Sequence, residues 1–404
     1  MPRIIFLNRF FYPDHSATSQ ILSDLAFHLA DTGGDIHVIA SQQRYDDANA
    51  RLPEYEVIRG VGVRRVPTTR FGRAQLIGRA FDYLSYYRAV GEAVAGIARP
   101  GDILVAKTDP PLLSVVAARA AKRSGARLVN WLQDLYPEAA IALGVPLMKG
   151  PAANILARLR DKSLHAATTN VVLGDAMAGR LVALGIPPDK ISIIPNWTDD
   201  ESIVPMPVAG NPLRREWHLE GKFVVGYSGN FGRAHDFDAM LAAAQRLRDH
   251  ERIAFVFIGG GRQRDTLVRY VRDKGLERTV RVLPYQDRAA LPSSLAVADV
   301  HWLSLRPELE GVIFPSKFYG IAAAGRPIIA LTDPGGEIAG LLGRYCCGFA
   351  VGLTDVDCLT ALLTTLAGDP ARCDELGRRS RAMLNAAFTR RHAFSLWRTV
   401  LNLD

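Results

Sequence analysis

The chain has 404 residues, which is more than a single hydrophobic core usually organises, so we expect two domains of similar size. A hydrophobic content of 48% and a charged content of 22% are those of a globular protein and exclude a disordered, collagen-like or solenoid chain. The formal net charge of +8 predicts an anionic partner: nucleic acid, lipid headgroups or a phosphorylated small molecule.

The cysteines and the N-terminus exclude further classes. None of the four cysteines has the CxxC spacing of a zinc or redox site, so we expect reduced core cysteines. The N-terminal MPRIIFLNRFFYPDH lacks the pattern of a signal peptide, and no segment has the ~18 uninterrupted apolar residues of a membrane span. These features predict a cytoplasmic protein, with attachment to a membrane surface still open.

Short apolar segments alternate with longer amphipathic ones, a pattern that predicts parallel strands joined by helices. In the first half, strands are expected at 3–7, 35–40, 61–67, 102–106, 127–131, 170–173 and 191–194. The helices expected between them include 19–29, 74–97, 112–122 and 152–164.

The alternation stops at a proline-rich stretch, PNWTDD followed by three more prolines, which suits neither a helix interior nor a central strand. We place the domain boundary there, with an N-terminal domain at 1–198 and a C-terminal domain at 199–387. Strands are expected again at 223–227, 253–258, 279–283, 300–303, 328–331 and 349–351. The chain closes with three helical stretches, and residues 388–404 are expected to pack back onto the N-terminal domain.

Two doubly wound sheets that face each other across a hinge form a cleft at the carboxyl ends of their strands, where such sheets bind ligands. Candidate functional residues should therefore lie directly after the strands.

The first strand of the C-terminal domain continues as GYSGNFGR, which contains Gly229, Asn230 and Arg233. Glycines let the backbone approach a ligand, and a helix N-terminus with an arginine suits a phosphate. The segment is neither GxGxxG nor a Walker motif, so it indicates neither a dinucleotide nor a P-loop. A plain glycine turn between strand and helix explains it equally well.

Two further strand ends belong to the same expected edge. GGGR, with Gly260, is flexible and basic, and PYQD places Tyr285 where it could border a flat base. Each segment alone is weak evidence for a ligand site, and the evidence becomes stronger because they are expected at the same edge of the sheet.

The segment ELEGVIFPSKFYG is the most informative. Pro315 and Ser316 fit a helix N-terminus that leaves unpaired N–H groups, Lys317 adds a point charge, and Glu310-Gly311 makes a tight acidic loop beside it. Such a place can hold a diphosphate and a sugar hydroxyl together. The alternative is a solvated surface lysine and an ordinary loop acid.

In the N-terminal domain, the strand that ends at Trp131 continues as LQDLYPE, with Gln133 and Asp134. The first strand opens into FFYPDHSAT, where Ser16 and Ala17 stand near the start of a helix. Asp134 is expected to point into the cleft opposite the lysine of the PSK segment. An aspartate that caps the following turn is the alternative.

Five motifs in this order, QDLYPE, IPNWTD, GYSGNFG, PYQD and FPSKFYGIAAAGRP, cover nearly the whole chain. Together they resemble the retaining glycosyltransferases of family four, and within them the bacterial branch that builds colanic acid, O-antigen and related exopolysaccharides. The resemblance implies a GT-B fold, a nucleotide-sugar donor held mainly by the C-terminal domain, and no metal or other cofactor. It also implies retention by front-face attack, in which the leaving diphosphate helps to deprotonate the acceptor. Donors aimed at a leaving diphosphate stabilise the transition state more than the ground state.

We assign candidate roles on this basis. The candidate catalytic residues are Asp134 and Glu310. The candidate donor-binding residues are Gly229, Asn230, Arg233, Gly260, Tyr285, Gly311, Ser316 and Lys317. The candidate acceptor-side residues are Ser16, Ala17 and Gln133.

The chain departs from the family pattern at several positions. The paired glutamates of the family correspond to Val312 and Gly320, and Glu310 is our substitute for one of them. The family's Arg and Lys after the first C-domain strand align with Asn230 and His235, which leaves Arg233 and Lys317 as the phosphate cations.

Most of the excess charge lies between Arg59 and Arg99, where eight arginines stand against Asp82 and Glu92 for a local charge of +6. The stretch also holds the aromatic residues Phe71, Phe81, Tyr83, Tyr86 and Tyr87. Arginines mixed with aromatics on a helix suit an anionic membrane surface, and a solvated arginine face beside an aromatic core is the alternative. Nucleic acid is not expected, because no DNA- or RNA-reading module accompanies the charge.

The leading hypothesis is a cytoplasmic glycosyltransferase, peripheral at the inner face of the cytoplasmic membrane. It would move a sugar from a UDP- or GDP-linked donor to a polyprenyl-diphosphate-linked glycan in exopolysaccharide or O-antigen synthesis. Two alternatives stay open: a nucleotide-sugar epimerase on the same architecture, and a degenerate, non-catalytic scaffold of a polysaccharide assembly complex. The sequence does not identify the sugar, the base or the acceptor.

Overall fold

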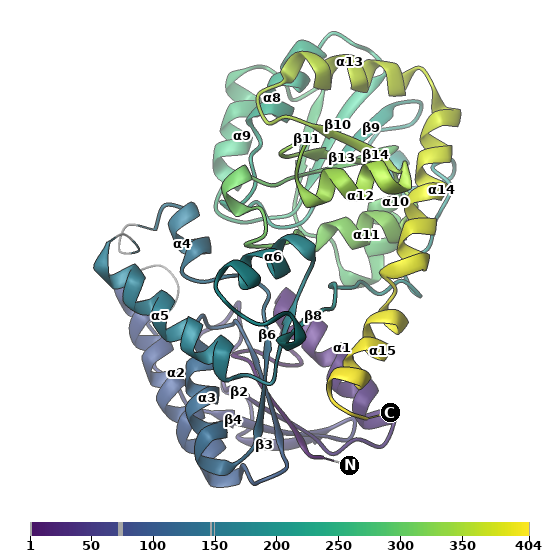
Figure 1. Ribbon diagram of the computed structural model, residues 1–404. Coiled ribbons are helices and arrows are strands. Elements are labelled where there is room, and N and C mark those ends of the chain that lie inside the picture. The colour runs from purple at the N-terminus through teal and green to yellow at the C-terminus, as the bar shows by residue number, and fades with distance from the viewer. Residues whose placement is uncertain (1, 72–75, 146–147, 149, 404) are drawn as a thin grey trace. The chain divides into compact units, whose positions relative to one another are not determined.

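The computed structural model describes residues 2–71, 76–145, 148 and 150–403. The chain divides into two compact units (Figure 1). Unit 1 comprises Met1–Pro195, Gly311–Phe314 and Phe394–Asp404, and unit 2 comprises Asn196–Glu310 and Pro315–Ala393.

Unit 1 contains an eight-stranded sheet in the order β3-β4-β2-β1-β5-β6-β7-β8. Its strands are β1 (Ile4–Leu7), β2 (Ile36–Ser41), β3 (Tyr55–Ile58), β4 (Val61–Val66), β5 (Ile103–Lys107), β6 (Arg127–Trp131), β7 (Thr169–Val172) and β8 (Ile191–Ile193). The pairings are parallel except that of the edge strand β3 with β4. Strand β3 was not predicted, because its four residues are exposed or half-buried and form no buried apolar run.

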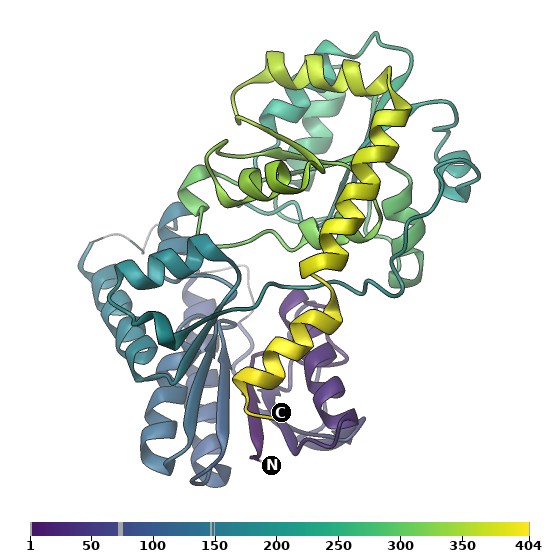
Figure 2. The same cartoon turned by 45° about the vertical axis from the view of Figure 1, so that its right-hand side comes forward.

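Helices cover both faces of this sheet. They are α1 (Ala17–Asp31), α2 (Leu76–Ile97), α3 (Leu113–Ser124), α4 (Glu138–Ala142), α5 (Pro151–Ala166), α6 (Asp175–Ala183) and the C-terminal α15 (Arg390–Val400), of which the residues from Phe394 belong to unit 1. On one face, α2 and α3 pack on side chains of β1 and β5 such as Leu7 and Leu104. Figure 2 shows α15, in yellow, beside α1, in purple, where the rings of Phe394 and His28 stack with centroids 4.4 Å apart.

Unit 2 contains a six-stranded parallel sheet in the order β11-β10-β9-β12-β13-β14. Its strands are β9 (Phe223–Ser228), β10 (Ile253–Ile258), β11 (Val280–Leu283), β12 (Val300–Ser304), β13 (Ile328–Leu331) and β14 (Gly348–Val351). Its helices are α7 (Pro212–Glu216), α8 (Asp238–Arg246), α9 (Arg264–Asp273), α10 (Leu291–Ala296), α11 (Lys317–Ala323), α12 (Glu337–Tyr345), α13 (Val356–Ala367) and α14 (Pro370–Ala387).

The strand order of unit 2 reverses direction between β9 and β12, as in a Rossmann fold. Parallel sheets bind ligands at such a switch point, outside the carboxyl ends of the strands. Buried aromatic side chains support this edge from below: the ring of Tyr227 packs on Trp302 and Phe237, with centroids 4.7 and 5.1 Å away. The order of the strands therefore directs attention to the residues that follow Ser228 and Ser304.

Candidate functional site

Lys317 lies at the switch point of unit 2. Its ammonium donates a hydrogen bond to the Tyr227 hydroxyl at 2.6 Å and lies 2.9 Å from Nε2 of His235. It also lies 4.2 Å from the centroid of the Tyr227 ring. Lys317 comes from the first turn of α11, Tyr227 from β9, and His235 from the loop between β9 and α8. Three separate segments thus hold one cation.

The electrostatics of this group favour an anionic ligand. Burial lowers the pKa of Lys317 well below its usual 10.5. Burial, followed by the charge of Lys317, lowers the pKa of His235 to about 3, so His235 is neutral near pH 7. In the part of the chain that the structure describes, Lys317 has two neutral hydrogen-bond partners and no carboxylate beside it. A partly buried cation without a counter-ion is stabilised when an anion binds to it.

Glycines let the chain pass close to this lysine. Gly229 has φ of +139°, and a Cβ there would lie 3.3 Å from Cε of Lys317. A Cβ at Gly259 would overlap the carbonyl oxygen of Gly229. The glycines of the two strand ends are therefore required by packing, whatever they bind.

Tyr285 and Gly260 meet beside this group. The Tyr285 ring is 59% exposed, and its hydroxyl donates to the Gly260 carbonyl at 3.3 Å. A Cβ at Gly260 would lie 3.0 Å from the ring. An exposed flat ring at these strand ends can stack against a planar base. Asn230 and Arg233 are also exposed, and within the described residues the Arg233 side chain has no hydrogen bond or ion pair.

The start of α11 pairs some of its N–H groups and leaves others unpaired. Ser316 is the N-cap of α11, but the N–H groups of Phe318 and Tyr319 donate to the carbonyls of Pro315 and Ser316, at 3.1 and 3.2 Å. The prediction of unpaired N–H groups at this helix start is therefore confirmed for Ser316 and Lys317, whose N–H groups have no hydrogen-bond partner among the described residues. It is wrong for Phe318 and Tyr319, because the first turn tightens into shorter-range hydrogen bonds.

Glu310 and Gly311 were expected to form a tight acidic loop beside Lys317, and the structure gives each of them a different role. The Glu310 carboxylate accepts a hydrogen bond of 2.7 Å from the backbone N–H of Glu337, the first residue of α12. It therefore supports the N-terminus of that helix. Gly311 has φ of +67° and belongs to unit 1, where a Cβ would lie 2.8 Å from the Ala176 carbonyl.

In unit 1, candidate residues gather at the ends of neighbouring strands. The N–H of Gln133 donates to the Thr108 hydroxyl at 3.2 Å, and the Asp134 carboxyl bonds to the same residue. Burial raises the pKa of Asp134 to about 6. The Thr18 hydroxyl donates to Asp109 at 3.0 Å, which ties the start of α1 to the end of β5.

Ser16 and Ala17 lie at that same helix start. Ser16 is buried, its N–H donates to Asp14 at 2.8 Å, and within the described residues its hydroxyl has no partner. Ala17 is exposed. The acceptor-side candidates therefore share one edge of the unit 1 sheet, at β1, β5 and β6.

Sequence reasoning missed Lys107, the last residue of β5. The side chain is fully buried, and its ammonium lies 3.6 Å from the centroid of the Trp131 ring with no hydrogen-bond partner among the described residues. Burial lowers its pKa to about 7. A lysine that ends the apolar run ILVA was the available signal.

The basic segment 59–99 also differs from the expectation. Arg65 is fully buried and forms an ion pair with Glu56, Arg59 pairs with Asp31, and Arg73 lies outside the described residues. Tyr86 belongs to the core under α2 rather than to a lipid-facing surface, because it lies on the apolar face of the helix.

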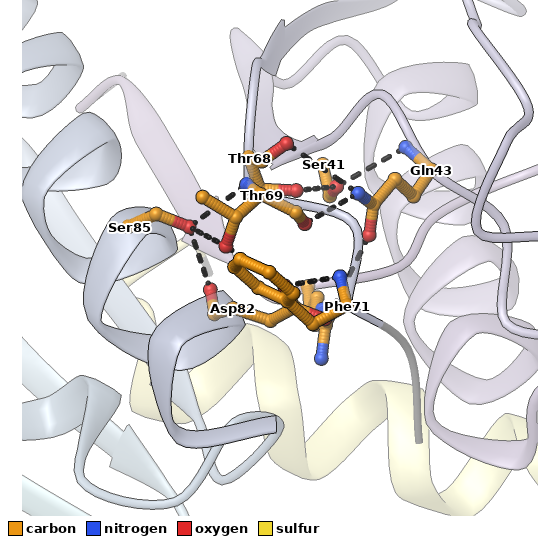
Figure 3. A network of polar contacts seen from close by, with 8 residues as sticks. Ser41, Gln43, Thr68, Thr69, Phe71, Asp82 and Ser85 are labelled. Atoms are coloured by element: carbon orange, nitrogen blue, oxygen red, sulfur yellow. Dashed lines mark hydrogen bonds and ion pairs between the residues drawn. The ribbon is translucent and has the colours of Figure 1, made fainter. Parts of the chain in front are cut away.

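Asp82 is buried as well and ties the chain before α2 to the helix (Figure 3). Its carboxylate accepts hydrogen bonds from the Thr69 hydroxyl at 2.7 Å and the Phe71 N–H at 3.1 Å. The residues that stay exposed beside it are Arg70, Phe71, Phe81, Leu84 and Arg88.

Two family models match successive parts of the chain. Residues 17–197 match the glycosyl transferase 4-like domain, and residues 212–383 match the glycosyl transferases group 1. The chain belongs to the GT-B glycosyltransferases. The resemblance read from the five motifs is thereby confirmed.

Curated relatives of this glycosyltransferase include two bacterial proteins. It is 30% identical over 248 residues to the probable glycosyltransferase WbjE of Pseudomonas aeruginosa, with 61% of each chain covered. It is 27% identical over 230 residues to the putative colanic acid biosynthesis glycosyl transferase WcaI of Escherichia coli K12, over 56% of this chain and 55% of WcaI. The chain thus spans less than two thirds of the length of either relative.

Solved structures confirm the predicted fold class. Over the full length of both chains, the glycosyltransferase is similar to Anabaena HepE in complex with UDP and glucose, with a TM-score of 0.75 and 16% identity. Sucrose-phosphate synthase of Thermosynechococcus elongatus has a TM-score of 0.79 at 14% identity, again over both full chains. WaaG, a glycosyltransferase involved in lipopolysaccharide biosynthesis, has a TM-score of 0.69 at 14% identity over 99% of each chain.

Proposed function

We propose that this glycosyltransferase transfers a sugar from a nucleotide-diphosphate donor to a lipid-linked glycan during exopolysaccharide or O-antigen synthesis. The name of WcaI, a putative colanic acid biosynthesis glycosyl transferase, and the UDP in the HepE structure support the substrate class. The observation that carries the proposal is the Lys317 ammonium, which stands at the switch point of unit 2 without a carboxylate.

Lys317 suits the leaving group of such a reaction. As the bond between the sugar and the diphosphate breaks, negative charge grows on the diphosphate oxygens. A preorganised cation beside these oxygens stabilises the transition state more than the ground state. Arg233, exposed on the same loop as His235, adds a second cation that can move to the ligand. We propose that the reaction proceeds with retention and without a metal ion.

Thermal-shift titration with UDP, GDP and ADP tests the donor site. We expect one nucleotide to raise the Tm of the wild type, because a ligand that binds the folded state stabilises it by mass action. Lys317→Met should abolish this rise, whereas Lys274→Met, at an exposed lysine next to α9, should keep it. No stabilisation by any of the three nucleotides, or an undiminished shift in Lys317→Met, would contradict the proposal.

Transfer itself is tested with a polyprenyl-diphosphate-linked acceptor and a radiolabelled donor. Label in the lipid fraction is the expected result. Conversion of the donor to an isomer without acceptor would indicate an epimerase, and donor binding without any transfer would indicate a scaffold.

For the membrane, we propose that the exposed residues near the start of α2 contact anionic lipid at the inner face of the cytoplasmic membrane. No helix among the described residues is long and apolar enough to cross a membrane. Phe71 is 64% exposed and Phe81 55%, with ring centroids 5.9 Å apart, and the exposed Arg70 directly precedes Phe71 in sequence. Exposed aromatics beside an arginine suit the interfacial region of an anionic bilayer.

Co-sedimentation with vesicles tests this surface. Binding should require phosphatidylglycerol and weaken as salt is added, because salt screens the arginine–lipid attraction. The double variant Arg70→Ser with Phe81→Ser should lose most of the binding. Val182→Ser, which also removes an apolar side chain exposed in unit 1, should not. Equal binding by all of these proteins would remove the surface from the proposal.

A further inference from the structure

Hydrogen-bond direction at Lys317 follows from its neighbours. The Ser304 carbonyl can only accept, so Nδ1 of His235, 2.8 Å away, carries the proton and Nε2 is left as an acceptor. The Tyr227 hydroxyl donates its proton to the Asn230 carbonyl at 2.8 Å, so its oxygen is also an acceptor. Both acceptors point to the ammonium of Lys317, at 2.9 and 2.6 Å.

A protonated lysine has three N–H groups. The two acceptors take two of them, and among the described residues nothing takes the third. We propose that Tyr227 and His235 are positioning residues that orient the Lys317 ammonium so that this third N–H is directed at the diphosphate of the donor. The inference rests on the proposed function of the site and adds the residues that set its geometry.

The rest of unit 2 holds both acceptors in place. Tyr227 is fully buried among aromatic rings, including Trp302 at 4.7 Å between centroids. His235 is fixed through its backbone: its N–H donates to the Gly232 carbonyl, and its carbonyl accepts from the Gln263 side chain at 3.1 Å. A cation held by such fixed groups loses little conformational freedom when the ligand arrives.

Neutral acceptors keep the charge of the lysine available. A carboxylate in the place of Nε2 or of the hydroxyl would hold the ammonium equally well but would cancel the field that attracts a diphosphate. Tyr227 and His235 are the titratable groups in contact with Lys317 among the described residues. Burial raises the pKa of Tyr227 and lowers that of His235, so both are neutral at working pH.

Two substitutions of His235 separate its roles. In His235→Gln, the side-chain oxygen can take the place of Nε2 and accept from Lys317. In His235→Asn, the shorter amide can bond to the Ser304 carbonyl but does not reach the lysine. We expect His235→Asn to weaken nucleoside diphosphate binding by about tenfold and His235→Gln to restore most of it, in line with the loss of one hydrogen bond to a charged group.

Tyr227→Phe removes the second acceptor and keeps the ring in the core. It should also weaken binding by about tenfold. Tyr270→Phe in α9, which removes a hydroxyl bonded to Gln245 of α8, should leave binding unchanged. Dissociation constants for UDP and GDP are measured by calorimetry above pH 7.5, where the terminal phosphate is fully ionised. In the transfer assay, the loss should appear in both kcat and kcat/KM.

The outcomes separate this inference from the proposed function. If Lys317→Met loses binding while His235→Asn and Tyr227→Phe bind like the wild type, the two residues do not position the lysine and the inference is wrong. If Lys317→Met binds like the wild type, the proposed donor site itself is wrong. Should His235→Asn fail to fold, Tyr227→Phe, which keeps the core ring, still decides the question.

Discussion

Two lysines of this glycosyltransferase lie in places where a charge is costly, and they differ in what surrounds them. Lys317 has two neutral acceptors and is only half-buried, so a ligand can reach it. Lys107 is fully buried against Trp131 and has no hydrogen-bond partner among the described residues. A buried ammonium without a partner is destabilised, and burial lowers its pKa. Lys317 is therefore a candidate binding group, whereas Lys107 affects stability.

The stability of unit 1 should depend on the titration of Lys107. Its pKa is about 7 in the folded protein and near 10.5 in the unfolded chain, so between these values the unfolded chain binds more protons. The free energy of unfolding therefore rises with pH over this range and falls again as the pH is lowered toward 7. Lys107→Met should be more stable than the wild type at pH 7, and its advantage should shrink by roughly 1 kcal/mol per pH unit toward pH 10.

Urea unfolding at pH 7, 8.5 and 10 measures this difference. Lys122→Met, at an exposed position of α3, serves as the control and should follow the pH dependence of the wild type. If the free energy of unfolding changes with pH in the same way for the wild type and Lys107→Met, Lys107 keeps an ordinary pKa.

At the scale of elements, the C-terminal helix α15 is part of the core of unit 1. Trp397 is fully buried, and its ring centroid lies 4.5 Å from that of Trp131 at the end of β6. The residues from Phe394 onward belong to unit 1 although nearly 200 residues separate them from its main part. The helix therefore completes one face of the sheet.

Trp397→Ala should destabilise unit 1 by about 3–5 kcal/mol, because it removes a large side chain from a closed core and leaves a cavity. Ser395→Ala, at an exposed position of the same helix, should change stability by less than about 0.5 kcal/mol. Differential scanning calorimetry distinguishes the two variants. A Tm of Trp397→Ala equal to that of the wild type would mean that α15 does not contribute to the core.

For the whole molecule, the net charge of +8 does not define one surface. Arginines of the most basic stretch are used inside the fold, as in the Arg65–Glu56 pair, or in surface pairs such as Arg88–Glu92. The two units also have separate sheets and separate cores. A ligand of unit 2 should therefore leave the core of unit 1 largely unchanged.

Hydrogen exchange with and without the nucleoside diphosphate that binds tests this expectation. Protection should increase in peptides that cover 226–235, 257–263 and 315–320, because these segments contain Lys317, its two hydrogen-bond partners and the glycine turn that packs on Gly229. Peptides from β5 and α3 should show no change. Protection confined to unit 1 would place the nucleotide on the other unit.

The sequence alone predicted every parallel strand to within one or two residues, because runs such as IAFVFI in β10 are buried on both faces and leave a continuous apolar signal. It did not predict β3, whose side chains are largely in solvent. It also selected Lys317, Gly260, Tyr285 and Asp134 as candidate residues, since these follow directly after strands or lie in recognisable motifs, and their roles stay predictions.

The tertiary structure decided which groups meet. Tyr227 lies 90 residues from Lys317 and His235 lies 82 residues from it, and no local pattern reports such separations. The Glu310 carboxylate, expected beside the lysine, instead supports the start of α12. Strand periodicity is a local property that the sequence records directly. Contacts among strand ends depend on the order of strands in the sheet, which is settled by the packing of the whole unit.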